Sequence, residues 1–420
     1  MNILIKSATI IDPASGQNIK KQPQDILIEN GHIVKIAPSI ETKKSVTVVA
    51  LENLHVSPGW FDSSVCFGEP GYEERETLAN GLKTAAMSGY TAVAVNPNTK
   101  PVLDTNTDIS FIKTRAKGEA VNLIPIGALT VKSEGNDLAE LYDMKNAGAA
   151  AFCDYQKAVT NPNLLKIALQ YAQDFDGLIC SFPQENKIAG KGVVNEGVNA
   201  THLGLKGIPS LAEDLQVKRD LSILEYTGGK LHIPTISTEA SVNAIKDAKE
   251  KGLDVSCSAS LTHLFFNDEV LEAFDSNFKL LPPLRTKKEV EALLDAVKDG
   301  KIDMVTTDHN PLDIEHKNVE FDRASYGSIG LESAFGALNS LVGIELAIKL
   351  LTNGKKRFGV EISMIEEGQK ADLTLFNPDV SYTFEKSHIL SSSKNSAFLG
   401  TNLKGKAYGI IANNQLILNS

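Results

Sequence analysis

The middle of the chain alternates short apolar runs with amphipathic stretches, as strands and helices in succession would. The apolar, β-branched runs lie at 91–95, 123–127, 149–152, 177–180, 230–233, 253–257 and 302–307. Stretches with a helical spacing of apolar residues separate them, for example at 76–87, 164–173, 241–251 and 287–298. Repeated strand-then-helix order indicates a parallel sheet with helical crossovers. About eight such units in this length favour an α/β fold closed into a (β/α)₈ barrel of the TIM type.

The two ends of the chain predict strands without intervening helices. Such runs occur at 3–5, 25–28 and 32–36 near the start, and at 371–376, 408–412 and 415–418 near the end. Asn30-Gly31 and Asn413-Asn414 are turn sequences between neighbouring runs. We expect the ends to form one small β-sandwich-like domain, from residues 1–55 and 352–420. The barrel would then occupy residues 56–351.

Composition and charge narrow the classes of function. Of the 420 residues 42% are hydrophobic and 22% are charged, as in a soluble globular protein. The net charge of -10, without a dense basic cluster, argues against a nucleic-acid partner. No apolar run reaches the roughly 18 residues that span a bilayer, and the start is not a signal peptide. The cysteines, Cys66, Cys153, Cys180 and Cys257, are scattered, so we expect no disulfides and a cytoplasmic location.

In a barrel of this kind, chemistry lies at the C-terminal ends of the strands. The segment 58–71, PGWFDSSVCFGEPG, ends the first candidate barrel strand. It resembles the opening motif of the dihydroorotase family in the amidohydrolase superfamily, PGFIDxHxHxREPG. The flanks match closely, whereas the two histidines are Ser64 and Cys66 and the arginine is Gly68.

The spacing of the two replaced histidines has a physical meaning. Residues two apart on a strand point to the same face, so an HxH pair aims two imidazoles at one metal ion. Ser64 and Cys66 keep that aim with different chemistry. A serine hydroxyl is a poor zinc ligand, and a single thiolate does not make a zinc site.

The resemblance continues in order along the chain. Residues 96–101, NPNTKP, are similar to MPNTxP, which implies a substrate-binding role for Asn98. Residues 151–155, AFCDY, are similar to AFSDD, and the metal-binding aspartate of that motif corresponds to Asp154 or to Tyr155. A metal-binding histidine is replaced by Ser181 after the strand candidate at 177–180. Another is replaced by Thr235 in 231–238, which resembles LHIxHxST and keeps its first histidine, His232.

Two later motifs complete the comparison. Residues 279–285, KLLPPLR, resemble KxNPPLR with Leu281 in place of the asparagine. Residues 307–312, TDHNPL, resemble TDHAPH. The resemblance implies that Asp308 corresponds to the catalytic base and metal ligand, and that His309 lies in the substrate site. Leu312 replaces the last histidine, which helps to hold the substrate carboxylate.

The matches fall on the scaffold and the mismatches on the chemistry. We therefore expect a non-catalytic dihydroorotase homologue of pyrimidine biosynthesis that binds no zinc, with Asp154 and Asp308 as possible remnants of the metal site. Inactive chains of this family serve as scaffolds for aspartate transcarbamoylase, so the resemblance implies that enzyme as a partner, or failing that a homo-oligomer.

Two alternatives stay open from the sequence. One is an active cyclic-amide hydrolase with a remodelled site, in which Asp308 is the base, Asn98 binds substrate, and Cys66 with Asp154 holds one metal. The other is a small-molecule sensor that uses the vacated pocket. In the cysteine pattern, only Cys66 is expected to face inward, and Cys180 is expected to face away from the mouth because it neighbours Ser181.

Overall fold

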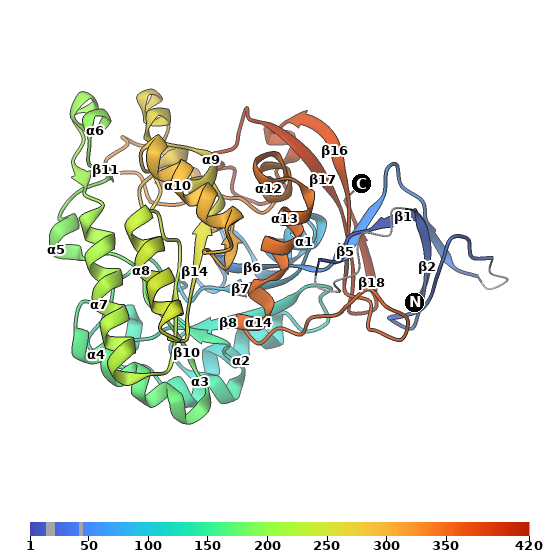
Figure 1. Ribbon diagram of the computed structural model, residues 1–420, viewed down its shortest axis with the longest axis horizontal. Coiled ribbons are helices and arrows are strands. Elements are labelled where there is room, and N and C mark those ends of the chain that lie inside the picture. Colours follow the sequence, from blue (N-terminus) through green and yellow to red (C-terminus); the bar gives the residue numbers. More distant parts are fainter. Residues whose placement is uncertain (14–21, 42–44, 420) are drawn as a thin grey trace.

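The computed structural model describes residues 1–13, 22–41 and 45–419, and it contains the predicted (β/α)₈ barrel beside a sheet built from both ends of the chain (Figure 1). The barrel sheet has the order β15-β14-β13-β10-β9-β8-β7-β6, all parallel. Its strands are β6 (Trp60–Val65), β7 (Tyr90–Val95), β8 (Asn122–Gly127), β9 (Ala151–Phe152), β10 (Leu178–Cys180), β13 (Lys230–Ile233), β14 (Val255–Ser260) and β15 (Met304–Thr306).

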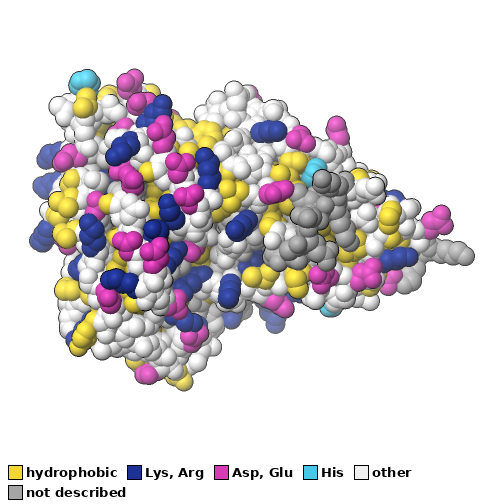
Figure 2. Space-filling model, in the orientation of Figure 1, with side chains coloured by type: hydrophobic (Ala, Val, Ile, Leu, Met, Phe, Trp, Pro, Cys, Tyr) yellow, Lys and Arg dark blue, Asp and Glu magenta, His cyan; other side chains and the backbone are white. Residues whose placement is uncertain are grey.

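Helices follow each barrel strand and form the outer layer. They are α1 (Leu78–Met87), α2 (Asn106–Arg115), α3 (Leu141–Ala147), α4 (Pro162–Ala172), α7 (Leu211–Thr227), α8 (Glu239–Glu250), α10 (Lys287–Lys298), α12 (Ala334–Val342) and α13 (Ile344–Thr352). Local signals begin several of them. Thr105 and Asp108 form a capping box on α2, and Asn161 caps α4 ahead of Pro162. Lys/Arg and Asp/Glu side chains are interspersed over the face seen in Figure 2.

Shorter elements decorate the rim and the base of the barrel. They are η1 (Val131–Ser133), η2 (Gln173–Phe175), α5 (Asn186–Ala189), β11 (Val194–Asn195), α6 (Val198–Leu203), β12 (Gly207–Ile208), α9 (Leu261–Phe265), η3 (Asp268–Ala273), η4 (Ser276–Phe278), α11 (Ile314–Lys317), α14 (Gly354–Arg357) and η5 (Lys386–His388). No helix among the described residues combines the length and apolarity needed to cross a membrane.

The second sheet joins the two ends of the chain. Its strands are β1 (Asn2–Ile10), β2 (Gln24–Glu29), β3 (His32–Ala37), β4 (Thr47–Val49), β5 (His55–Pro58), β16 (Leu373–Thr383), β17 (Asn402–Ala412) and β18 (Gln415–Leu418). β1 pairs with β2 and β4 along its first half and with β5 at its end. Between these halves Ser7 has a φ of 53°, and the register shifts there, so the sheet bends around one apolar core. The proposed domain boundaries at 55/56 and 351/352 stay predictions.

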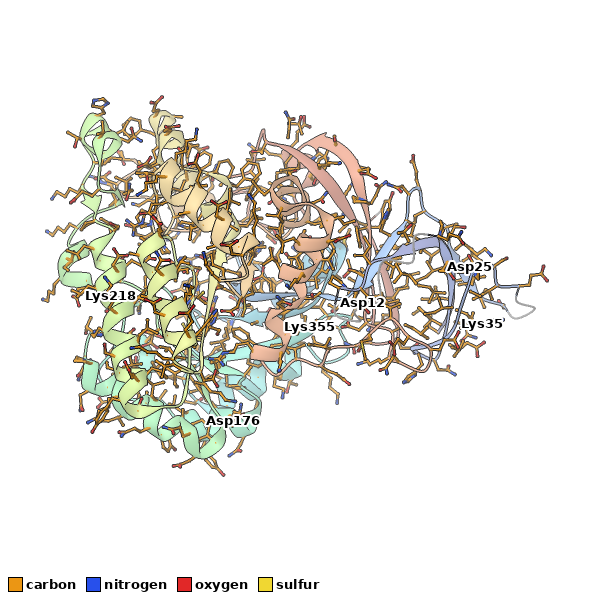
Figure 3. All side chains as sticks on the ribbon, in the orientation of Figure 1. Asp12, Asp25, Lys35, Asp176, Lys218 and Lys355 are labelled. Atoms are coloured by element: carbon orange, nitrogen blue, oxygen red, sulfur yellow. The ribbon has the colours of Figure 1, made fainter. Side chains whose placement is uncertain are left out.

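The barrel interior is filled near its base. Phe358, at the end of α14, packs against Phe61 of β6 with ring centroids 5.5 Å apart, and equally close to the ring of His232. A buried ion pair lies where α14 leads toward the second sheet: the Lys355 ammonium lies 2.6 Å from the Asp372 carboxylate. Lys355 is labelled in Figure 3. The barrel closes at the mouth, where Val65 bridges to His309 and the Cys66 N–H donates to the His309 carbonyl over 2.7 Å.

Candidate functional site

The residues at the end of β6 are held by a buried carboxylate beneath them. Asp62 accepts hydrogen bonds from the backbone N–H of Ser64 (3.0 Å) and of Thr307 (3.0 Å), and from both threonine hydroxyls at the end of β15. This ties the first and last barrel strands together where the site begins. The arrangement fixes the direction of Ser64 and of Asp308.

Ser64 and Asp308 contact each other directly. The Ser64 hydroxyl donates to the Asp308 carboxylate over 2.8 Å and accepts from the Asn96 amide over 2.9 Å. Asn96 Nδ2 also lies 3.7 Å from the Cys66 sulfur. Burial raises the pKa of the Cys66 thiol well above its ordinary value, so without a bound cation this sulfur carries its proton at neutral pH.

Asp308 is the carboxylate at the centre of the site. Burial raises its pKa to about 6, and hydrogen bonds from Ser64 and from the Tyr155 hydroxyl (3.2 Å) oppose that shift only in part. The nearby charge of Asp62 contributes to the same rise. Its backbone has a φ of 48°, in the left-handed region, where an aspartate is tolerated better than most side chains.

The structure separates the two candidates for the second metal-binding aspartate. Tyr155 lines the mouth cavity and reaches Asp308. Asp154 turns the other way: its carboxylate accepts from the backbone N–H groups of Leu129 (3.0 Å) and Thr130 (3.1 Å) and so holds the loop after β8. A phenol therefore occupies the place beside Asp308.

The strand ends of β10 and β13 contain one departure from expectation. The Ser181 hydroxyl donates over 2.6 Å to Asp220 on helix α7, while Cys180 lines the mouth cavity. The expectation that Cys180 faces away from the mouth was wrong, because a carboxylate on α7 attracts the hydroxyl of the next residue. Thr235 lines the cavity with a φ of 50°, and its N–H donates to Ser258 Oγ over 3.2 Å.

His232 matches the first histidine of the family motif, and both of its ring nitrogens have hydrogen-bond partners in the protein. Its Nδ1 lies 2.8 Å from Ser256 Oγ and its Nε2 lies 3.3 Å from Ser258 Oγ. Burial lowers its pKa to about 3, which leaves the imidazole neutral at physiological pH. Both ring nitrogens therefore have protein partners.

Three positions at which the family motifs have polar side chains, residues 68, 281 and 312, have no such side chain here. A Cβ on Gly68 would lie 1.9 Å from the Tyr72 carbonyl oxygen, so this backbone has no room for the arginine of the motif. Leu281 packs in an apolar cluster with Phe182 and Ile208, and Leu312 is buried. These residues replace polar groups by apolar packing.

Asn98 and His309 are placed near the site by the motif flanks. The Asn98 side chain interacts with the Cys66 thiol, and its Oδ1 is buried without a partner. His309 Nδ1 accepts from the N–H groups of Gly330 (3.1 Å) and Leu331 (3.4 Å), while its Nε2 is buried and unpaired. Burial lowers the pKa of His309 to about 4.

What remains open at the mouth is a cavity of about 20 Å³, lined by Ser64, Asn96, Tyr155, Cys180, His232, Thr235 and Asp308 among others. A single water needs roughly 10–15 Å³ by this measure, whereas small-molecule sites span roughly 300–1,000 Å³. The cavity therefore has room for about one water and none for a ring-shaped substrate.

Zinc, which the active family members hold, does not fit this donor set. Ser64, Ser181 and His232 are committed to hydrogen bonds with Asp308, Asp220 and two serines. Across the described residues, no three His, Cys, Asp or Glu side chains converge as a metal site requires. One carboxylate with a neutral thiol and a phenol beside it lacks the imidazoles that make zinc bind.

Sequence reasoning missed several residues of the site. Asn96 could have been found, because it begins the quoted motif at 96–101. Phe358 could not be predicted from the sequence. It follows the four-residue helix α14 and reaches the cavity from the base of the barrel, outside every motif. Asp220 likewise lies 39 residues from Ser181 with no motif to link them.

Comparison with known proteins agrees with this architecture. The family model described as "Dihydro-orotase-like" matches residues 54–241. A dihydroorotase of Pelotomaculum thermopropionicum is 38% identical across 100% of this chain and 99% of its own length, and one of Geobacter metallireducens is 37% identical across 99% of each. Among solved structures, an L-hydantoinase from Arthrobacter aurescens has a TM-score of 0.85 at 20% identity, covering 99% of this chain and 96% of its own.

A D-hydantoinase from a Thermus species shares the fold at a TM-score of 0.84 and 20% identity, over 99% of this chain and 95% of its own. The fold and the location of the site define a (β/α)₈ barrel of the amidohydrolase type with an additional sheet domain. Full-length identity to the relatives makes the assignment more specific: the chain belongs to the dihydroorotase family.

Proposed function

We propose that this chain is a non-catalytic dihydroorotase homologue of pyrimidine biosynthesis, which acts in the cytoplasm as a structural partner of aspartate transcarbamoylase. The observation that carries the non-catalytic part is the mouth itself. The positions of the family's metal ligands are occupied by Ser64, Cys66, Ser181 and Thr235, and about 20 Å³ stays open between the remaining side chains. Without a metal, hydrolysis of a cyclic amide loses both carbonyl polarisation and the acidified water.

The partner follows from the family resemblance and not from a contact in the structure. A barrel whose mouth is packed by its own side chains can still present its outer helices and rim loops to another chain. A stable interface should bury more than about 1,000 Å² in total. If aspartate transcarbamoylase is not the partner, a homodimer of this chain is the next proposal.

Catalysis is tested with the purified full-length chain, dihydroorotate and added zinc. We expect no stoichiometric zinc by plasma mass spectrometry and no turnover above the uncatalysed rate. The matched control is Asp308→Asn: activity that survives this substitution belongs to a contaminating enzyme. Turnover that requires Asp308, together with one or two bound metals per chain, would refute the non-catalytic proposal.

A second candidate is an active cyclic-amide hydrolase with a remodelled site. Two observations favour it: relatives of 34–38% identity are named dihydroorotase, and Asp308 has a pKa of about 6, which is suitable for a general base near neutral pH. It requires the mouth to open far beyond the cavity described here. The turnover assay with the Asp308→Asn control decides between the two.

The partner is tested separately, by mixing the chain with aspartate transcarbamoylase of the same organism and sizing the mixture beside each protein alone. We expect a shared peak of higher mass at micromolar concentration. Separate elution, with the chain strictly monomeric, would contradict both the heteromeric and the homodimeric proposal while leaving the catalytic test untouched.

A further inference from the structure

A second cavity lies at the opposite end of the barrel from the mouth. It has a volume of about 660 Å³ and is bounded by the starts of β13, β14 and β15 and by helices α10, α13 and α14, several of which are labelled in Figure 1. This volume falls within the range of roughly 300–1,000 Å³ that is typical of small-molecule sites. In contrast to the mouth, the base of the barrel has space for a ligand.

The charges that line the base cavity do not balance. Its three acidic residues each have a cation: Asp254 pairs with Arg357, Asp303 with Lys249 at 2.7 Å, and Asp299 with Lys301 at 2.9 Å. Those carboxylates are therefore neutralised by the protein.

Two lysines of the lining have no such partner. Lys349, in the last turn of α13, and Lys356, in α14, make no side-chain hydrogen bond or ion pair with any described residue, and both are exposed to solvent. The other two lysines of the cavity are paired, Lys230 with Asp176 at 2.6 Å and Lys298 with Asp295 at 3.7 Å. Lys349 and Lys356 thus form a local positive surplus on a chain whose net charge is -10.

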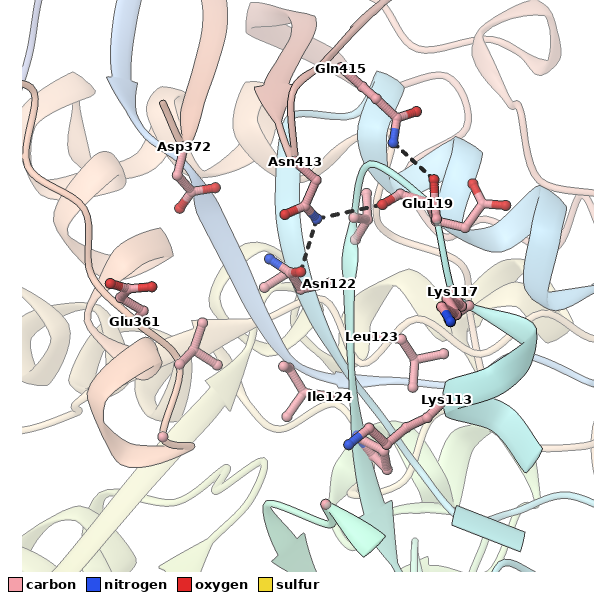
Figure 4. A pocket seen from close by; sticks show the side chains of 18 of the residues that line it. Lys113, Lys117, Glu119, Asn122, Leu123, Ile124, Glu361, Asp372, Asn413 and Gln415 are labelled. Atoms are coloured by element: carbon pink, nitrogen blue, oxygen red, sulfur yellow. Dashed lines mark hydrogen bonds between the residues drawn. The ribbon is translucent and has the colours of Figure 1, made fainter. Parts of the chain in front are cut away.

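A neighbouring cavity at the same end of the barrel provides a comparison (Figure 4). It measures about 560 Å³ and lies between α2, β8 and the C-terminal sheet, where Asn413 Nδ2 donates to Asn122 over 2.9 Å. Of its acidic residues Asp372 pairs with Lys355, so Glu119 and Glu361 remain to offset its three lysines. A similar volume with a smaller cationic surplus makes it the natural control for an electrostatic effect.

We propose that the base cavity bounded by Lys349 and Lys356 binds an anionic small molecule that carries a phosphate or polyphosphate group. The two ammonium groups supply charge-assisted hydrogen bonds to the phosphate oxygens. The volume exceeds what a phosphate group fills, so a phosphorylated metabolite the size of a nucleotide suits it best. This proposal does not depend on the function assigned to the mouth.

The test is calorimetric titration of the full-length chain with two probes, inorganic tripolyphosphate and a ribonucleoside triphosphate, at low and at physiological salt. We expect one site per chain with a submillimolar dissociation constant, weaker at higher salt because free ions screen exposed charges. Equal affinity for the two probes would assign recognition to the phosphates alone. Tighter binding of the nucleotide would add contacts to its nucleoside part.

The variant is Lys349→Ala/Lys356→Ala and the matched control is Lys117→Ala/Lys370→Ala, which removes two exposed lysines from the neighbouring cavity. We expect at least a tenfold weaker affinity in the first and less than a twofold change in the second, with unchanged circular dichroism in both. Absence of binding by the unmodified chain, an unchanged affinity in the first variant, or an equal loss in both variants would each overturn the proposal.

Discussion

At the scale of single residues, the feature with the clearest consequence for stability is the buried carboxylate of Asp308. Its carboxylate accepts hydrogen bonds from the hydroxyls of Ser64 and Tyr155. Hydrogen bonds from hydroxyl groups stabilise an ionised carboxylate less than a bound divalent cation would. The effect of burial therefore outweighs them, and the pKa rises to about 6. The residue is therefore expected to weaken the fold at neutral pH.

Asp308→Asn should stabilise the protein at pH 7. The folded-state pKa of about 6 exceeds the unfolded value of 3.8, so the folded state keeps its proton as the pH rises from about 4 to about 6. Stability is lost across that window, by about 1.4 kcal/mol per pKa unit. The asparagine should raise the free energy of unfolding by about 1–3 kcal/mol at pH 7 and change it little at pH 4, as measured by urea denaturation.

The control for this substitution is Asp137→Asn, in an exposed bend outside any helix, which should leave the urea midpoint unchanged at both pH values. A loss of stability in Asp308→Asn at pH 7 would instead mean that the ionised carboxylate is stabilised by a bound cation. That result would favour the remodelled hydrolase.

At the scale of elements, the sequence predicted the barrel well because its strands are apolar runs buried on both faces. The run at 123–127 is found as β8 (Asn122–Gly127), and the run at 302–307 as the shorter β15 (Met304–Thr306). The rim strands β11 and β12 were missed, since two residues give no periodic pattern.

The site was predicted less completely than the fold. The motifs predict Ser64, Thr235 and Asp308 at strand ends, and all three line the cavity at the mouth: Ser64 on β6, and Thr235 and Asp308 just after β13 and β15. The direction of Ser181 depends on Asp220, which lies on a helix that packs outside the strand. Contacts between distant elements of this kind carry no local signal in the sequence.

The loop after β6 gives a prediction at this scale. Gly68 N–H donates to the Glu76 carbonyl over 2.9 Å, and Tyr72 N–H donates to the Gly68 carbonyl over 2.8 Å. Restoring the motif with Gly68→Arg, or adding only a methyl group with Gly68→Ala, forces backbone apart at the Tyr72 carbonyl. Each should lower the free energy of unfolding by about 1–3 kcal/mol, measured with urea, and the arginine should not create dihydroorotate binding.

Gly197→Ala is the appropriate comparison for Gly68→Ala, because nothing but the end of the Asn195 side chain lies within 4 Å of its added Cβ. It should change stability by less than about 0.5 kcal/mol. If Gly68→Ala were as mild, the loop would be able to move, and the closure of the arginine position would not be a property of the backbone.

At the scale of the whole molecule, three buried neutral histidines should reduce the stability of the fold in acid. Burial lowers the pKa of His232 to about 3, and of His263 and His309 to about 4, against 6.5 in an unfolded chain. As the pH falls below about 6.5, the unfolded state takes up protons that the folded state refuses, so stability is lost. Asp308 acts in the opposite direction, and so do the other carboxyl groups whose pKa burial raises: Asp62, Asp154, Asp214, Asp220 and Glu289.

We therefore expect each of the three histidines to lower the free energy of unfolding between pH 6.5 and pH 4.5. His263→Gln removes one contribution and should flatten the profile by about 2 kcal/mol at pH 5, whereas His32→Gln on the exposed hairpin should not. A profile that is the same in His263→Gln as in the unmodified chain would show that this histidine gains its proton within the fold.

The pairing of β5 with β16 also constrains when the molecule can be completed. Pro58 lies opposite Leu373, so one strand must wait for a partner that the ribosome delivers about 300 residues later. At about 5–20 residues per second, that delay is on the order of 15 s to 1 min. Throughout it the N-terminal strands have an unpaired edge, and such edges recruit other chains. The last segment to be synthesised, which supplies β16, β17 and β18, therefore covers the edge left open by the N-terminal strands. Nascent chains that stall before residue 373 should be the form of this protein most prone to aggregate.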